Sequence, residues 1–116
     1  MVFEKRGKKR IQSFNLSYVA LDDGGNIVCQ GMGRTLNVSE AGILLETGFS
    51  IPLNCKILLS IGLEDDIVNI EGNVAHSRVG KSGNFETGIR FTRIDNNELD
   101  VLKIFIKYFE NNKKRI

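Results

Sequence analysis

In the stretch Ile67-Val68-Asn69-Ile70-Glu71-Gly72-Asn73-Val74-Ala75-His76, most side chains at every second position are apolar. Val68, Ile70, Val74 and His76 fall on one parity, which is the period of a strand with one buried face. Gly72 interrupts the run and predicts a β-bulge or a bend in the strand. The stretch therefore predicts a half-buried β-strand.

Turn signals repeat on either side of this strand. They are Asp22-Asp23-Gly24-Gly25, Gly62-Leu63-Glu64-Asp65-Asp66 and Gly80-Lys81-Ser82-Gly83-Asn84. Between and beside them lie β-rich runs at residues 14–21, 27–38, 42–47, 56–63, 67–79 and 84–94. Six short strands in hairpin order predict a mostly β protein built as a small antiparallel barrel. Pro52, the only proline, falls in a predicted loop.

A helix is predicted after the last strand, over residues 95–112. Asp95 stands at its start and Glu98 three residues later, which is the spacing of a capping box. One apolar stripe keeps helical spacing: Leu99, Leu102, Phe105, Ile106 and Phe109. A second stripe comprises Val101, Ile104 and Tyr108. We favour core packing for this second stripe, and a homodimer or partner surface on the helix is the alternative.

Most of the positive charge lies in the first ten residues. The whole chain has a net charge of +2, but this segment alone carries +4, from Lys5, Arg6, Lys8, Lys9 and Arg10 against Glu4. Proteins that coat a polyanion usually spread basic residues over a face or stripe. A positive charge confined to one short N-terminal arm is better matched to a small ligand with phosphate groups than to a long polyanion. We divide the single domain 1–116 into a basic arm (1–12), a β-barrel (13–94) and the helix (95–112).

Residue types that support catalysis or metal binding are scarce. His76 is the only histidine, and it has no partner at ligand spacing. Cys29 and Cys55 are the only cysteines; we interpret them as small buried hydrophobes, with a disulfide as the alternative. We expect no enzymatic activity, no metal and no cofactor. The chain has no secretory signal and no apolar run of roughly 20 residues, which predicts a cytoplasmic protein without membrane insertion.

Two short motifs point to a ligand. Arg6 and Arg10 form RxxxR, and Asn37-Val38-Ser39-Glu40-Ala41-Gly42 contains NxSxxG. Guanidinium groups bind phosphate oxygens, cover base faces or reach the O6 and N7 atoms of guanine. Asparagine and serine add short polar groups, and glycine allows a tight turn. Together with the later Gly88-Ile89-Arg90-Phe91, these motifs resemble the PilZ domain family over nearly the whole chain.

The resemblance implies a six-stranded antiparallel PilZ-like β-barrel with a C-terminal α-helix, acting as a receptor for the bacterial second messenger cyclic di-GMP. It implies that Arg6 and Arg10 hold the phosphates and guanine edges. Asn37 and Ser39 would recognise guanine and phosphate from the barrel rim, and Gly42 would hold the turn. Asn37 stands where many members have Asp, and the lost charge predicts weaker binding.

The composition of the arm suggests a mechanism. Residues 1–10 carry +4 with little apolar content, so we expect them to be mobile without ligand. Bound ligand would neutralise the arm and order it across the barrel mouth. A downstream protein, such as a flagellar or polysaccharide-synthesis target, would then recognise the changed surface. No sequence feature identifies that partner.

Two other functions compete with this one. A ligand-independent interaction module of the same fold would be marked by loss of Arg6, Arg10 or Ser39, and all three are present. A small barrel with a basic arm could instead bind nucleic acid. That mode needs exposed aromatic side chains for base stacking. The chain has no Trp and two Tyr, beside seven Phe that mostly match internal positions, so we regard nucleic acid as the weaker interpretation.

Overall fold

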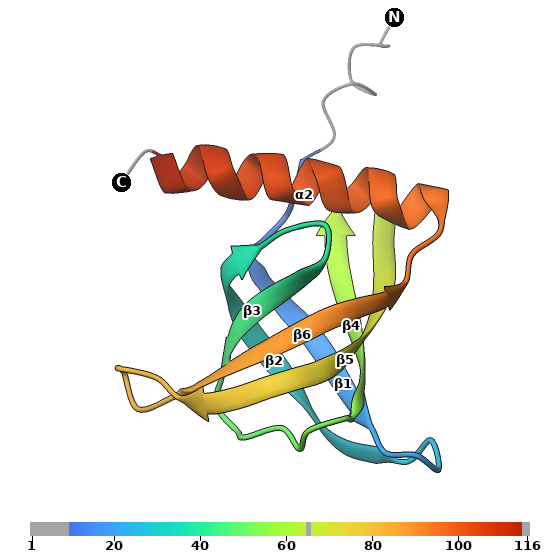
Figure 1. Ribbon diagram of the computed structural model, residues 1–116. Helices are drawn as coiled ribbons and strands as arrows, with labels where there is room; N and C mark the ends of the chain where they lie inside the picture. Colours follow the sequence, from blue (N-terminus) through green and yellow to red (C-terminus); the bar gives the residue numbers. More distant parts are fainter. Residues whose placement is uncertain (1–9, 65, 115–116) are drawn as a thin grey trace, which may run out of the picture.

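A computed structural model describes residues 10–64 and 66–114 of the chain. Its elements, in order, are β1 (Asn15–Leu21), β2 (Ile27–Val38), β3 (Gly42–Thr47), β4 (Lys56–Leu63), β5 (Asp66–Val79), β6 (Phe85–Arg93) and the helix α2 (Asn96–Lys114). The strands form a closed antiparallel barrel in the order β1-β2-β3-β6-β5-β4, and α2 lies across one end of it (Figure 1). The predicted six-stranded antiparallel barrel with a C-terminal helix is confirmed. The strand ends agree with the predicted ranges to within one residue.

The turn signals act through local hydrogen bonds and glycine conformation. Asp22 Oδ1 accepts hydrogen bonds from the backbone nitrogens of Gly24 and Asn26, each at 2.9 Å. Gly25 follows in the left-handed region with a φ of 82°, and Gly83 has a φ of 90° in the turn between β5 and β6. Because side chains with a Cβ rarely adopt this conformation, the glycines allow both hairpins to close.

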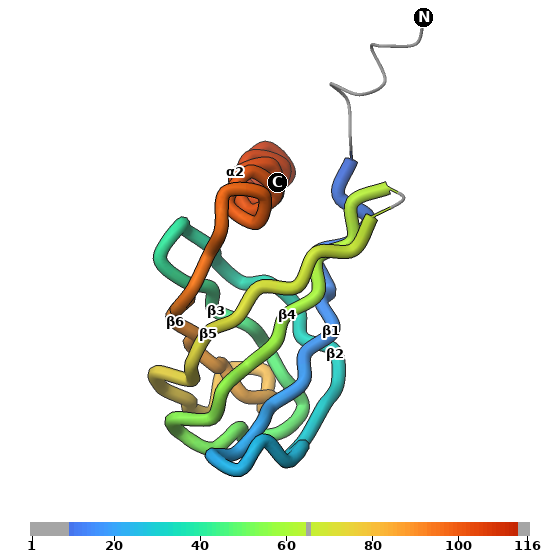
Figure 2. Tube along the Cα trace, turned by 90° about the vertical axis from the view of Figure 1, so that its right-hand side faces the viewer, coloured from blue at the N-terminus to red at the C-terminus, as the bar shows by residue number. Residues whose placement is uncertain are grey.

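The helix begins with the predicted capping box. Glu98 N donates to Asp95 Oδ1 at 2.8 Å, and Asp95 N donates to Glu98 Oε1 at 3.2 Å. These two bonds satisfy backbone donors that the first helical turn leaves without partners. The cap therefore sets where the chain leaves the barrel and turns across its end (Figure 2).

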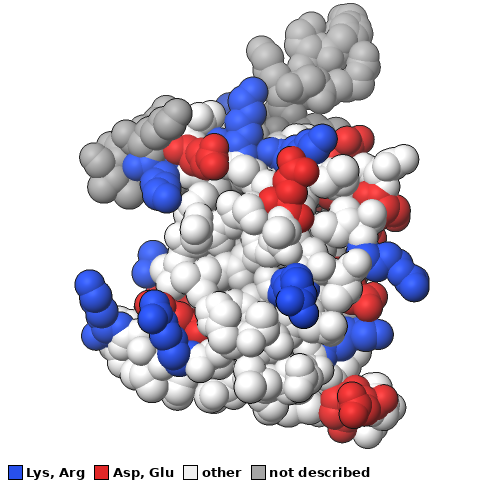
Figure 3. Space-filling view, in the orientation of Figure 1, with Lys and Arg blue, Asp and Glu red and all other residues white. Residues whose placement is uncertain are grey.

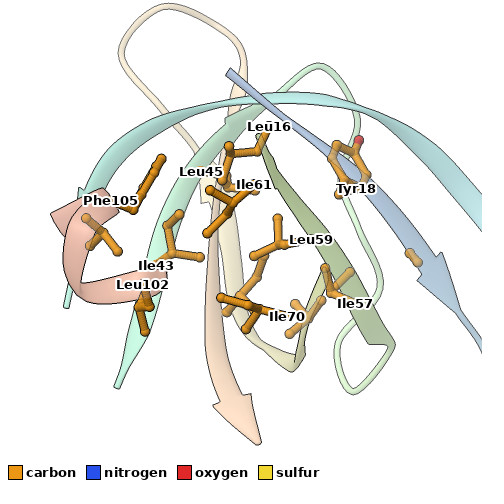
Figure 4. Packing of buried hydrophobic residues seen from close by; sticks show 14 of the residues in the cluster. Leu16, Tyr18, Ile43, Leu45, Ile57, Leu59, Ile61, Ile70, Leu102 and Phe105 are labelled. Carbon is orange, nitrogen blue, oxygen red and sulfur yellow. The ribbon is translucent and has the colours of Figure 1, made fainter. Parts of the chain in front are cut away.

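The apolar face of α2 closes the barrel end. Leu102 and Phe105 are fully buried and lie beside Ile43 of β3 (Figure 4). The Phe14 ring, just before β1, packs edge-on against Phe105 and Phe109, with ring centroids 5.5 Å apart in both pairs. Such aromatic pairs add to the stabilisation from buried area alone. The helix is thus anchored at both the β1 entry and the barrel core.

The second apolar stripe of the helix is also covered. Val101 is buried, and Ile104 and Tyr108 are half-buried. Within the described part of the chain, α2 contributes none of the large exposed apolar side chains. This arrangement favours core packing as the reason for the second stripe, and the homodimer through the helix stays a prediction.

The opposite end of the barrel is closed by a loop. Strands β3 and β4 are not neighbours in the sheet, so the connection between them, residues 48–55, has to cross this end (Figure 1). Ile51 in this connection is only 1% exposed, and Pro52 lies beside it in the loop, as predicted. Alternate residues of the strands fill the space between the two ends, including Leu16, Tyr18, Leu45, Ile57, Leu59, Ile61 and Ile70 (Figure 4).

Two register shifts occur where β5 pairs with β6. Glu71 pairs with Arg93 and Gly72 with Phe91, so the irregularity predicted at Gly72 is present and its extra residue, Thr92, lies in β6. A second shift follows, because Val74 pairs with Ile89 while His76 pairs with Gly88. One extra residue therefore reverses which face the next side chain occupies. The parity prediction was right for Val74, which is buried, and wrong for His76, which is exposed on the outer face.

Candidate functional site

The NxSxxG motif occupies the connection between β2 and β3. Asn37 lies near the end of β2, Ser39 lies in the turn, and Gly42 is the first residue of β3. Ser39 N donates to the Gly42 carbonyl at 2.9 Å, and Ala41 N donates to Ser39 Oγ at 3.1 Å. The serine therefore stabilises the turn from within and holds its own hydroxyl at the barrel surface.

Gly42 is required by a close approach between strands. A Cβ at this position would lie 2.4 Å from the carbonyl oxygen of Ile89 in β6, well inside any normal contact. Gly42 has no left-handed backbone conformation, and it pairs with Arg90 in the register between β3 and β6. The expected role of this glycine in a tight turn is therefore better described as close packing of β3 on β6.

A hollow of about 430 Å³ opens on the outer surface beside this turn. Its walls come from four strands and include Asn37, Ser39, Gly42, Ala75, His76, Gly88 and Arg90. This face of the barrel, over β3, β6 and β5, is mostly uncharged, with few Lys or Arg side chains in its centre (Figure 3). No Asp or Glu side chain is among the described residues that line the hollow.

Two lining residues with polar side chains, His76 and Arg90, were not predicted as site residues. His76 reaches this face because of the bulge in β5, and its ring lies over Gly88, where a Cβ would clash with Nε2. Arg90 is exposed on β6, opposite Gly42. The sequence signal for Arg90 was Gly88-Ile89-Arg90-Phe91, which places a glycine and an arginine on one strand, whereas no sequence signal marked His76. The register that aligns them with NxSxxG is a property of the folded barrel.

Three of the polar side chains that line the hollow, those of Asn37, Ser39 and Arg90, can donate hydrogen bonds into it. Asn37 Oδ1 accepts from the Val38 backbone nitrogen at 3.0 Å, which leaves the amide nitrogen of Asn37 to donate elsewhere. Ser39 Oγ accepts from Ala41 N, and its own hydrogen is left to donate. Arg90 can only donate. A ligand that matches this surface needs many acceptors, such as phosphate oxygens or the N7 and O6 atoms of purines.

The RxxxR motif is described only in part. Arg6 lies outside the described residues, as does most of the basic arm, so its predicted position and ordering stay predictions. Arg10 is exposed, and its carbonyl accepts from Glu64 N at 3.0 Å. Ile11 forms a bridge with Leu63, which ties the chain after Arg10 to the end of β4. Arg10 is not among the residues that line the hollow.

The described residues contain no group of three or more His, Cys, Asp or Glu side chains that could hold a metal ion. Cys29 and Cys55 are both free rather than joined in a disulfide. Burial raises the pKa of each thiol, which favours the protonated form over a nucleophilic thiolate. Over residues 10–64 and 66–114, no helix has the length and apolar character needed to cross a membrane.

Comparison with known proteins gives one family match. The PilZ domain model matches residues 4–108, which is nearly the whole chain. The match spans the barrel, most of α2 and both motif arginines. No curated protein matches the chain.

Proposed function

Because the chain belongs to the PilZ domain family, whose members are non-catalytic modules that typically bind cyclic di-GMP, we propose that it is a cyclic di-GMP receptor in bacterial second-messenger signalling. The observation that carries the proposal is the position of Asn37 and Ser39 in an open hollow, where their side chains and that of Arg90 can donate hydrogen bonds. The hollow volume of about 430 Å³ falls in the usual range for sites that hold small ligands.

Each motif has a distinct role in the proposal. Ser39 donates its hydroxyl to a phosphate oxygen, and Asn37 contacts a purine edge from the rim. Arg6 and Arg10 bring forked donors to the phosphates and to guanine O6 and N7, and at least one guanidinium stacks on a base plane. Gly42 keeps β3 close to β6, which sets the width of the hollow.

Two further residues join these motifs. Arg90 adds a cation on the opposite wall of the hollow, where phosphate charge would otherwise lie against an uncharged surface. The His76 ring lies over Gly88 and provides a surface on which a base can stack. The pairing of β5 with β6 and of β6 with β3 brings both residues to this face of the barrel.

The proposed output is a change of surface. The arm reaches the barrel through Arg10, whose carbonyl is bonded to Glu64 N at the end of β4. Ligand bound in the hollow offers phosphates to the arginines of the arm and draws the arm across the barrel. A downstream protein, on a flagellar, polysaccharide-synthesis or other target, then recognises the combined surface of arm, ligand and barrel.

Two alternatives make different predictions. A ligand-independent interaction module would bind its partner equally well with and without cyclic di-GMP. A nucleic-acid-binding barrel would need exposed aromatic side chains for stacking, and Phe49 is the only exposed aromatic residue among those described. Phe49 lies in the loop at the barrel end opposite α2, away from the hollow.

The experiment is a calorimetric titration with cyclic di-GMP, and with single-stranded DNA as the competing ligand. Ser39→Ala removes the hydroxyl donor and should weaken cyclic di-GMP binding about tenfold, the scale of one hydrogen bond to a charged group. Ser17→Ala is the matched control, because this serine lies on the outer face of β1 and donates to Met32 Sδ at 3.2 Å. Equal affinities for the two variants, or tighter binding of DNA, would contradict the proposal.

A further inference from the structure

The end of the barrel opposite α2 carries most of the large exposed apolar side chains of the described residues. Five of the seven lie at this end: Ile27, Val28, Phe49, Leu53 and Val79. Single apolar side chains are ordinary on a protein surface, whereas a group of them in one place marks an interaction surface. This end of the barrel therefore has the composition of an interface.

The loop that crosses this end holds its exposed side chains in position. Ile51, in the middle of the loop, is buried in the barrel. On one side of it, the Phe49 carbonyl accepts from Thr47 Oγ1 at 2.8 Å. On the other side, Asn54 N donates to the backbone of β5 at 3.2 Å. Phe49 and Leu53 are thus presented by an anchored loop, and a surface already held in place loses little conformational entropy on binding.

Phe49 lies on the side of the β5–β6 hairpin, which is basic. Thr47, which bonds to Phe49, pairs with Phe85 of β6, and Phe85 pairs with Val79 of β5. Lys81 in the hairpin is exposed and forms no ion pair with any described residue. The other charged side chains of this region are paired with each other: Arg78 with Glu86, and Arg34 with Glu46. Lys81 therefore leaves this side with one uncompensated positive charge.

Leu53 lies on the side of the β1–β2 hairpin, which is acidic. It shortly precedes Lys56, the first residue of β4, and Lys56 pairs with Leu21 at the end of β1. Asp22 and Asp23 follow directly in the hairpin, are exposed, and form no ion pair within the described part of the chain. Lys56 itself is ion-paired with a glutamate of β5. This side therefore keeps an uncompensated negative charge.

A second copy of the chain carries the surface that matches this end. Acidic side chains gather at the lower right of Figure 3, at the β1–β2 hairpin, and basic ones at the lower left, at the β5–β6 hairpin. In a contact with twofold symmetry, the Phe49 side of each copy faces the Leu53 side of the other. The geometry points to a twofold homodimer through this end, in which Phe49 packs against Leu53 and Lys81 pairs with Asp23 of the second copy.

The charge pattern favours a second copy over other occupants. Charges of both signs at opposite rims match a surface that carries the same signs in reverse order, which a polyanion or a membrane surface does not. None of Phe49, Leu53, Lys81 and Asp23 lines the hollow beside Ser39, so the dimer leaves the hollow accessible. The inference is therefore independent of the proposed ligand.

The apolar contact is tested by sedimentation velocity of the full chain over about 1–200 μM. We expect a monomer–dimer equilibrium with a Kd below about 100 μM for the unmodified protein. Phe49→Ser and Leu53→Ser should each raise this Kd about tenfold or more. Ile67→Ser is the matched control, because Ile67 is 72% exposed at the start of β5, near α2, and its loss should leave the Kd unchanged.

Charge reversal tests how the two copies are paired. Lys81→Asp and Asp23→Lys each place like charges opposite each other at both rims of a twofold contact, so each should raise the Kd several-fold. Combining both changes in one chain restores opposite charges and should restore the dimer. An equimolar mixture of the two single variants should also form a dimer, because each copy then meets the opposite charge at both rims.

The outcomes separate the inference from its competitors. Weakening by Phe49→Ser together with recovery in the doubly reversed chain supports it. A protein that stays monomeric up to about 200 μM overturns it and leaves this end to a different partner. A dimer that Phe49→Ser and Leu53→Ser do not weaken also overturns it, because such a dimer uses another surface. Loss of association in both charge variants without recovery in the combined one overturns the pairing of Lys81 with Asp23.

Discussion

Replacing Gly42 with alanine tests how the barrel sets the width of the hollow. The new Cβ would lie 2.4 Å from the Ile89 carbonyl oxygen, whereas ordinary contact begins at 3.4 Å, so β3 and β6 have to separate by about 1 Å. Strain of this kind costs about 1–3 kcal/mol. Alanine also restricts the unfolded chain, which returns about 0.4–1 kcal/mol. We expect a net loss of about 1–2 kcal/mol in the free energy of unfolding.

The assay is thermal unfolding followed by circular dichroism, with Gly48→Ala as the matched control. Gly48 is exposed, an added Cβ there would meet nothing within 4 Å, and its backbone is not in the left-handed conformation. We expect Gly42→Ala to lower Tm by roughly 5–10 °C and Gly48→Ala to leave it unchanged or slightly raised. Melting temperatures within about 2 °C of each other would refute the packing role of Gly42.

Three further predictions concern ligand binding, packing of the core and the pH dependence of stability. Arg10→Lys keeps the charge but loses the planar guanidinium, so it should weaken cyclic di-GMP binding by about 1–3 kcal/mol, while Lys8→Ala should have little effect in the same titration. Equal losses of binding free energy in the two variants would indicate that the arm acts only through its overall positive charge. Phe105→Ala empties a fully buried position beneath α2 and should lower the free energy of unfolding in urea by about 3–5 kcal/mol. Hydrogen bonds from the Asn26 backbone, with smaller contributions from the Asn26 side chain, Gly24 and Gly25, lower the pKa of Asp22. The ionised Asp22 carboxylate therefore stabilises the fold at pH values above its unfolded-state pKa, and this stabilisation is lost as the pH falls through its lower folded-state pKa. Asp22→Asn should make the free energy of unfolding depend less steeply on pH in this acidic range.

Much of the fold could be predicted from local sequence because its signals are local. The glycine-containing hairpin turns and the Asp95 capping box act within a few residues, and both appear as expected. The role of the second apolar stripe of α2 was harder to predict from the sequence, because an apolar helix face can cover a core or bind a partner. Burial of Val101 in the described structure favours the core.

The site was predicted only in part because its geometry depends on register. NxSxxG is contiguous, so Asn37 and Ser39 could be assigned from sequence, and both line the hollow. His76 and Arg90 lie on other strands and join them only through the pairing of β5 with β6 and of β6 with β3. A single extra residue in β5 reverses the side that His76 faces. Alternation in sequence carries no sign of that insertion.

Titration of the unmodified protein with cyclic di-GMP tests the central claim most directly. The donor-lined hollow and the basic arm predict saturable binding with a Kd of about 1 μM or tighter, or about −8 kcal/mol. Flat calorimetric traces at ligand concentrations up to about 100 μM would contradict the assignment of this chain as a cyclic di-GMP receptor.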